Sequence, residues 1–131
     1  FEASDEQGTP IYHTNVMMSV ADDFVVICLE AVTDLEEREM LLRFFSETGH
    51  AIIDIDFDQM NHFAGNMLAL KNKENNKLLA LSQSAFDSLN INQRSMINSY
   101  CEMIPLNIKT IETVGGGSAR CMIAEIFLPK K

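Results

Sequence analysis

A cysteine that follows a glycine-rich run is the most chemically suggestive feature of this sequence. Cys121 lies in the segment VGGGSARCMIAEIFL, residues 114–128. Glycines in series weaken a strand or a helix, so they need a local reason, and a close approach of backbone amides to a ligand is one such reason. Arg120 beside the cysteine could help to stabilise a thiolate. We predict that Cys121 is a nucleophile; the alternative is a small buried residue at the start of a strand.

A thiol nucleophile needs a group that moves protons, and the sequence offers three histidines. His50 directly follows the expected end of a helix, where we interpret it as complementing the helix terminus. His62 lies between two repeated units, either solvated or lining a pocket. His13 precedes the first strand of the first unit and is the remaining candidate. The other thiols, Cys28 and Cys101, are expected in the core.

Three acidic residues alternate along a short segment and raise the question of a metal site. Asp54, Asp56 and Asp58 are expected on one face of a strand, with no histidine or further carboxylate cluster beside them. We interpret them as a solvated face of a sheet. The three cysteines have no CxxC spacing, which argues against a zinc site and a disulfide framework. The sequence therefore predicts reduced thiols, no metal and no cofactor.

Alternating strand and helix patterns predict the elements that position these residues. Strands are expected at 15–20, 24–32 and 51–57, with a turn at 21–23 between the first two. A helix is expected over residues 35–49, because its apolar residues recur at helical spacing and because acidic residues occupy its first turn. Its N-cap is Thr33 or Asp34, and Gly49 is placed just past its end.

The same order of elements returns about 51 residues later. We expect strands at 66–72, 77–86 and 107–113, with a helix that starts at Asn90 or Asn92 and runs to about Glu102. A loop at 114–120 and a last strand at 121–128 follow. This internal duplication predicts an α+β fold of two ββαβ-type modules, at 13–58 and 66–113, joined by a linker at 59–65.

Composition limits the possible partners. Of 131 residues, 19 are acidic and 10 are basic, which gives a net charge of -9 and disfavours nucleic acid and anionic membranes as partners. No apolar run is long enough to span a bilayer, so we expect a cytoplasmic protein. The sequence begins with Phe1 rather than Met, and we interpret it as part of a longer protein.

Three segments resemble one enzyme family: YHTNVMMSV, FAGNMLALKN and ETVGGGSARCMIAEI. They are similar to the C-terminal half of the guanidino-group-modifying enzymes, the pentein superfamily, which includes arginine deiminases and amidinotransferases; the branch associated with citrulline utilisation is the most similar. The resemblance spans nearly the whole chain. It implies a five-bladed α/β propeller, of which two modules are present. It also implies that Cys121 is the nucleophile, that His13 is the general acid/base and that Gly116 and Gly117 line the site.

One departure from the family pattern bears on the substrate. Many deiminases have Asp two residues after the histidine, whereas this chain has Asn15. A neutral amide suits a neutral ureido group better than a cation, so we expect Asn15 to bind a citrulline-like substrate. The resemblance further implies that the carboxylates that orient the histidine come from modules preceding Phe1. We therefore predict a cysteine-dependent hydrolase, and little turnover by this chain alone.

Three other interpretations of the same resemblance remain open. The chain could transfer an amidino group, or it could be a non-catalytic binding scaffold, as in a ribosome-associated translation factor of the same architecture. Open strand edges could also lead to self-association.

Overall fold

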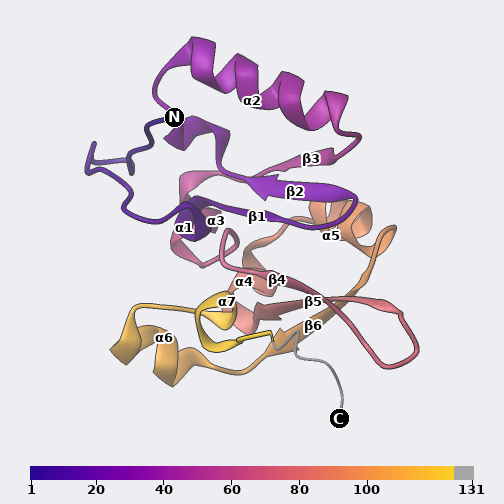
Figure 1. The fold of residues 1–131 in the computed structure, drawn as a ribbon. Helices are drawn as coiled ribbons and strands as arrows, with labels where there is room; N and C mark the ends of the chain where they lie inside the picture. The colour runs from indigo at the N-terminus through magenta and orange to yellow at the C-terminus, as the bar shows by residue number, and fades with distance from the viewer. Residues whose placement is uncertain (126–131) are drawn as a thin grey trace.

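Six strands form two separate three-stranded sheets in the computed structural model, which describes residues 1–125 (Figure 1). The first sheet holds β1 (Met18–Val20), β2 (Phe24–Ile27) and β3 (Ala51–Asp54), in that order. The second holds β4 (Leu68–Lys71), β5 (Lys77–Ser82) and β6 (Glu102–Leu106), again in chain order.

The two sheets have the same pairing pattern. In each, the central strand runs antiparallel to the strand before it and parallel to the strand after it. Phe24 pairs with Ala51 in the first sheet, and Leu78 pairs with Glu102 in the second. A parallel pair needs a crossover connection, and a helical segment supplies it in both cases. The expected duplication and the mixed α+β fold class are confirmed.

Helices connect and flank the strands. They are α1 (Thr14–Met17), the 3-10 helix η1 (Leu29–Ala31), α2 (Leu35–Glu47), α3 (Phe57–Asn61), α4 (Gln83–Ser88), α5 (Ile91–Asn98), α6 (Lys109–Gly115) and α7 (Ala119–Met122). The longest, α2, covers the first sheet (Figure 1). No helix in residues 1–125 is both long and apolar enough to cross a membrane.

Side-chain caps fix where the two crossover helices begin. The Asp34 carboxylate accepts hydrogen bonds from the amides of Glu36 at 2.8 Å and Glu37 at 3.1 Å, so Asp34 rather than Thr33 is the N-cap of α2. Past the end of α2, Gly49 has φ +79°. Asn90 caps α5 and forms a capping box with Gln93. This helix ends at Asn98, four residues earlier than expected.

Strand β2 lies at the centre of the core. All four of its residues are buried. Cys28 and Cys101 are also buried, as expected. The two sheets are joined on the surface by ion pairs of Asp22 with Lys71, at 3.0 Å, and of Asp23 with Lys77.

Several expected strands are shorter than predicted because helices occupy part of their length. Residues 14–17 form α1, so that Asn15 is helical. The expected strand 24–32 ends at Ile27 and continues as η1. Ser82 accepts a hydrogen bond from the Ala85 amide and starts α4 within 77–86.

Two further expectations near the chain end are wrong. Residues 107–113 were expected to form a strand, but β6 occupies 102–106 beside β5, and the chain then turns into α6. Cys121 was expected to open a strand of residues 121–128, but it lies in α7. The rest of that expected strand falls partly on residues 126–131, which lie outside the described part.

Candidate active site

One cavity brings together the five residues predicted to carry the reaction or bind the substrate. His13, Asn15, Gly116, Gly117 and Cys121 line a space of about 280 Å³. The remaining lining residues are Tyr12, Val16, Met60, Asn61, Phe63 and Asn66. The nominated residues come from α1, from α7 and from the turn before α7, so residues about 105 positions apart in the chain meet here.

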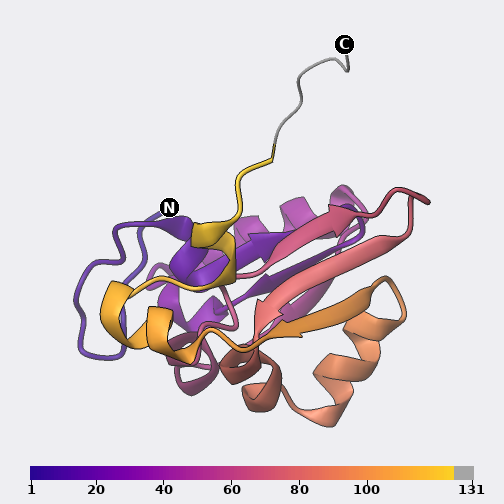
Figure 2. The same ribbon diagram turned by 90° about the horizontal axis from the view of Figure 1, so that it is seen from below.

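The packing of α1 against the segment before β4 forms one wall of this cavity. Helices α1 and α7 lie side by side at the same end of the molecule (Figures 1 and 2). A Cβ atom on Gly65 would lie 2.4 Å from the Val16 carbonyl oxygen and 2.8 Å from the Met17 carbonyl carbon. Only glycine allows the two backbones to approach this closely. Gly65 therefore brings α1 next to Asn66.

Two of the three glycines before the cysteine have distinct structural reasons. Gly116 ends α6 with φ +67°, a left-handed conformation that favours glycine. Gly117 is in contact with the cysteine: an added Cβ would lie 3.1 Å from Cys121 Cβ and 3.3 Å from Cys121 Sγ. Gly115 shows no such constraint, since a Cβ atom added there would lie 3.9 Å from its nearest neighbour, the Ile111 side chain. The glycine run thus makes the turn and leaves room for the thiol.

Backbone amides at this turn are only partly available to a ligand. The Gly116 amide donates to the Glu112 carbonyl at 3.1 Å, so it closes the helix. The Cys121 amide donates to the Ser118 carbonyl at 3.0 Å. Within residues 1–125 the Gly117 amide has no hydrogen-bond acceptor. Of the two nominated glycines, Gly117 is the one whose amide is available to a substrate.

A buried hydrogen bond that no sequence pattern indicated holds the two ends of the turn together. The Ser118 hydroxyl donates to the Glu112 carboxylate at 2.6 Å, and both residues are buried. A buried carboxylate needs such a donor, because burial without a partner is costly. The spacing of six residues between Glu112 and Ser118 matches no local motif, since it depends on the reversal at Gly116.

The three thiols differ in their surroundings. Cys121 is exposed, whereas Cys28 and Cys101 are buried. Burial raises the pKa of the Cys28 thiol to about 11, and it raises the pKa of the Cys101 thiol to about 11. A thiol with so high a pKa is almost wholly protonated at neutral pH and reacts slowly. Cys121 is the accessible thiol among the three.

Asn66 is a cavity residue whose role the sequence analysis missed. Its side chain is buried, and its Nδ2 lies 2.8 Å from the Asn15 carbonyl oxygen and 3.3 Å from Cys121 Sγ. Its backbone carbonyl accepts a hydrogen bond from the Arg120 amide at 3.4 Å. The signal in the sequence was the repeat itself, because Asn15 and Asn66 occupy corresponding places in the two units.

His13 and Asn15 are held by their backbones and present free side chains. His13 has an extended backbone and is the N-cap residue of α1, and its ring lies edge-on to Tyr12 with ring centroids 5.3 Å apart. Neither side chain forms a hydrogen bond to any residue of 1–125, although the Asn15 backbone carbonyl accepts one from Asn66. Both are thus available to a bound molecule.

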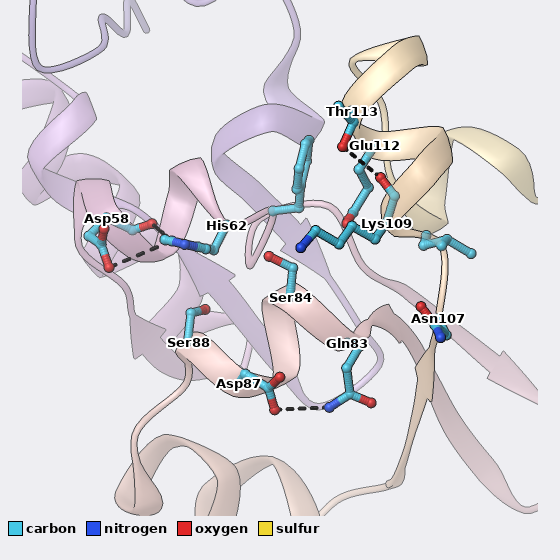
Figure 3. Close-up of a pocket in the computed structure, with 12 residues that line it drawn as sticks. Asp58, His62, Gln83, Ser84, Asp87, Ser88, Asn107, Lys109, Glu112 and Thr113 are labelled. Carbon is cyan, nitrogen blue, oxygen red and sulfur yellow. Dashed lines mark hydrogen bonds and ion pairs between the residues drawn. The ribbon is translucent and has the colours of Figure 1, made fainter.

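The other two histidines lie away from this cavity. His50 accepts or donates a hydrogen bond with the Thr48 hydroxyl at 2.9 Å, at the end of α2. His62 lines a second cavity, of about 620 Å³, and its Nδ1 lies 3.6 Å from Asp58 (Figure 3). This second cavity contains no thiol. Lys109 and Glu112 lie across it from His62, on α6 (Figure 3).

The acidic segment has structural roles. Asp54 accepts a hydrogen bond from the Leu29 amide at 3.1 Å, and Asp56 caps α3 in a capping box with Gln59. Asp58 lies within α3, so the three side chains do not share one strand face as expected.

Arg120 lines a separate groove of about 860 Å³ that also touches Asn15, rather than the cavity of Cys121.

Comparisons with known proteins identify relatives of this chain. Residues 1–128 match a family described as eukaryotic N,N-dimethylarginine dimethylhydrolase. A search of curated proteins gives no match. Among solved structures, the chain is similar to the apo form of ArgZ, an arginine dihydrolase of the ornithine-ammonia cycle in cyanobacteria, with a TM-score of 0.66 and 13% identity. The similarity covers 98% of this chain and 19% of that one, and it shows a shared fold.

Proposed function

Because the chain belongs to the eukaryotic N,N-dimethylarginine dimethylhydrolase family, a member of the pentein superfamily, we propose that it carries the nucleophile of an arginine-related hydrolase. The reaction is attack by Cys121 on the guanidino or ureido carbon of a citrulline- or arginine-related small molecule. One observation carries this proposal: Cys121, His13 and Asn15 line the same cavity. No other thiol of residues 1–125 is exposed.

The proposed reaction has two steps. The Cys121 thiolate forms a bond to the planar carbon, and the C–N bond to the departing amine breaks as His13 gives that nitrogen a proton. The resulting covalent thio-intermediate is then attacked by water, from which His13 takes a proton. Breaking the C–S bond releases the product and restores the Cys121 thiolate and the protonated His13. His13 suits both steps because its ring forms no hydrogen bond with any residue of 1–125.

Asn15 supports a neutral substrate in this proposal. Its side-chain amide has no hydrogen-bond partner in the described part of the chain and lines the cavity beside Cys121. An amide can both donate to a ureido oxygen and accept from a ureido N–H group, whereas a guanidinium offers donors only. Citrulline-like compounds are therefore the preferred substrate class over arginine.

The chain spans about a fifth, 19%, of the solved relative, so the proposal concerns the natural protein that contains this sequence. By the family resemblance, carboxylates that orient His13 and hold the substrate come from other modules. The Glu112 carboxylate, at the base of the turn, accepts a hydrogen bond from the Ser118 hydroxyl. Activity is therefore to be measured on the full-length protein.

The experiment is a measurement of ammonia release from citrulline and from arginine by the full-length protein and by its Cys121→Ala variant. Release that is lost in Cys121→Ala supports the proposal. Release that persists in this variant contradicts the role of Cys121. No release from either compound, by a protein whose Cys121 is alkylated normally, contradicts hydrolysis of these substrates and favours transfer of an amidino group or a binding role.

A further inference from the structure

We propose that Asn66 is a positioning residue that holds the Cys121 sulfur in place and stabilises its thiolate. This inference rests on the proposed function of Cys121 as a nucleophile. The central observation is that one buried amide touches both the thiol and the backbone of the segment that carries His13 and Asn15. Asn66 thus connects the two parts of the cavity.

The contact with Asn15 determines which way the Asn66 amide points. A carbonyl oxygen can only accept, so the atom that lies 2.8 Å from the Asn15 carbonyl must be the NH₂ group of Asn66. That NH₂ group carries two hydrogens. One is used by Asn15, and the second is available to Cys121 Sγ at 3.3 Å.

In this orientation the amide can serve both protonation states of the thiol. Cys121 Sγ lies 3.3 Å from Asn66 Nδ2 and 3.5 Å from Asn66 Oδ1. A protonated thiol can donate to Oδ1, and a thiolate can accept from Nδ2. Hydrogen bonds to a charged acceptor are the stronger of the two, so the contact favours the thiolate.

The surroundings leave Asn66 as the main source of such stabilisation. No lysine or arginine of residues 1–125 lines the cavity, and Arg120 lines a different groove. Among the lining residues, His13 is the only one that can carry a positive charge, and its ring forms no hydrogen bond within the described part. A neutral donor beside the sulfur therefore matters more here than it would beside a cation.

Asn66 is also well fixed in position. It is buried, its backbone amide donates to the Phe63 carbonyl at 2.8 Å, and its backbone carbonyl accepts from the Arg120 backbone amide. Gly65, the preceding residue, is packed against the backbone of α1. Since the backbone is held on both sides, the side-chain amide loses little entropy when it orients the sulfur.

The test is the rate of alkylation of Cys121 by iodoacetamide in the full-length protein, measured from pH 6 to pH 9. In Asn66→Asp an ionised carboxylate can no longer donate to a thiolate and repels it. We expect the rate at pH 7.5 to fall about tenfold, from the usual strength of a hydrogen bond to a charged group, and the rate profile to move to higher pH. Asn66→Ala should show a smaller fall.

Asn61→Asp is the matched control. Asn61 lines the same cavity and is exposed, and within residues 1–125 it forms no hydrogen bond with the sulfur, so the variant adds the same charge without removing the donor. Its rate should stay within about twofold of the unaltered protein. An unaltered rate in folded Asn66→Asp, or an equal fall in Asn61→Asp, overturns the proposal.

Protection of Cys28 and Cys101 from alkylation reports whether each variant is folded. If both Asn66 variants lose this protection, the proposal is tested by an NMR titration of the unaltered protein. Its Asn66 side-chain amide resonance should shift as Cys121 ionises and should not shift in Cys121→Ala; a resonance that does not move overturns the proposal. Alkylation requires no turnover, so a failure here is distinguishable from an absence of ammonia release.

Discussion

Gly117 and Cys121 are in direct contact, so that a Cβ atom on Gly117 would lie 3.3 Å from Cys121 Sγ. The contact explains why a glycine-rich run precedes this cysteine. Gly116 reverses the chain with a positive φ, and Gly117 leaves the space in which the thiol sits. The position of the sulfur therefore depends on residues that carry no functional group of their own.

The first prediction concerns this contact. In Gly117→Ala the new methyl group must displace the Cys121 side chain, because the separation is tighter than an ordinary van der Waals contact. We expect Cys121-dependent activity to fall about tenfold or more, since small displacements of a reacting group are costly. Gly115→Ala is the control, with ordinary contacts only, and should keep normal activity. Equal losses in both variants would contradict a specific role for Gly117.

The second prediction concerns the buried hydrogen bond behind the turn. Ser118→Ala removes the donor to the Glu112 carboxylate and leaves it buried without a partner. The free energy of unfolding should fall by about 1–3 kcal/mol, as measured by urea denaturation. Glu112→Gln keeps an acceptor for the Ser118 hydroxyl and should cost less. A smaller loss in Ser118→Ala than in Glu112→Gln would refute this role.

The third prediction follows from the buried thiols. Burial raises the pKa of Cys28 and of Cys101 to about 11, so the folded protein retains protons that the unfolded chain has released. Ionisation of these thiols should therefore leave the free energy of unfolding unchanged below about pH 9 and should lower it between about pH 9 and 11. In Cys28→Ala the dependence of the unfolding free energy on pH over this range should be weaker. An unchanged slope would exclude Cys28 as a contributor.

The fourth prediction concerns substrate choice. Asn15→Asp places a negative charge beside Cys121, which favours a cationic guanidinium over a neutral ureido group. The ratio of the rates for citrulline and arginine should move toward arginine by about tenfold, the size expected for one charge-assisted hydrogen bond. The measurement is ammonia release from each compound by the full-length protein. An unchanged ratio would rule out Asn15 as the selecting residue.

The overall fold could be predicted because its signals are local. Runs of apolar residues located the strands that begin at Phe24 and Lys77, and the Asp34 cap with its acidic first turn located α2. The repeat of these signals at a spacing of about 51 residues gave the two-unit arrangement. Element ends were less predictable, since the caps at Asp56 and Ser82 were overlooked. The β-branched residues of 107–113 favoured a strand, yet the position beside β5 was already taken by β6.

The candidate site could be predicted only in part. The sequence nominated Cys121, His13 and Asn15, and the structure places them around one cavity. Asn66 was not nominated as a site residue, because nothing in its neighbours shows that its side chain reaches a cysteine 55 residues away. Ser118 and Glu112 were missed for the same reason. Such contacts depend on where the chain returns in space.

The sequence by itself determined the central strands, the long helix α2, the repeat and the residue types that could do chemistry, because these depend on short-range patterns of side chains. Only the tertiary structure decided which of them meet. The close approach at Gly65 brings α1 to Asn66, and the reversal at Gly116 brings Cys121 to the same place. Contacts between distant segments arise from the packing of the whole chain, so no local pattern contains them.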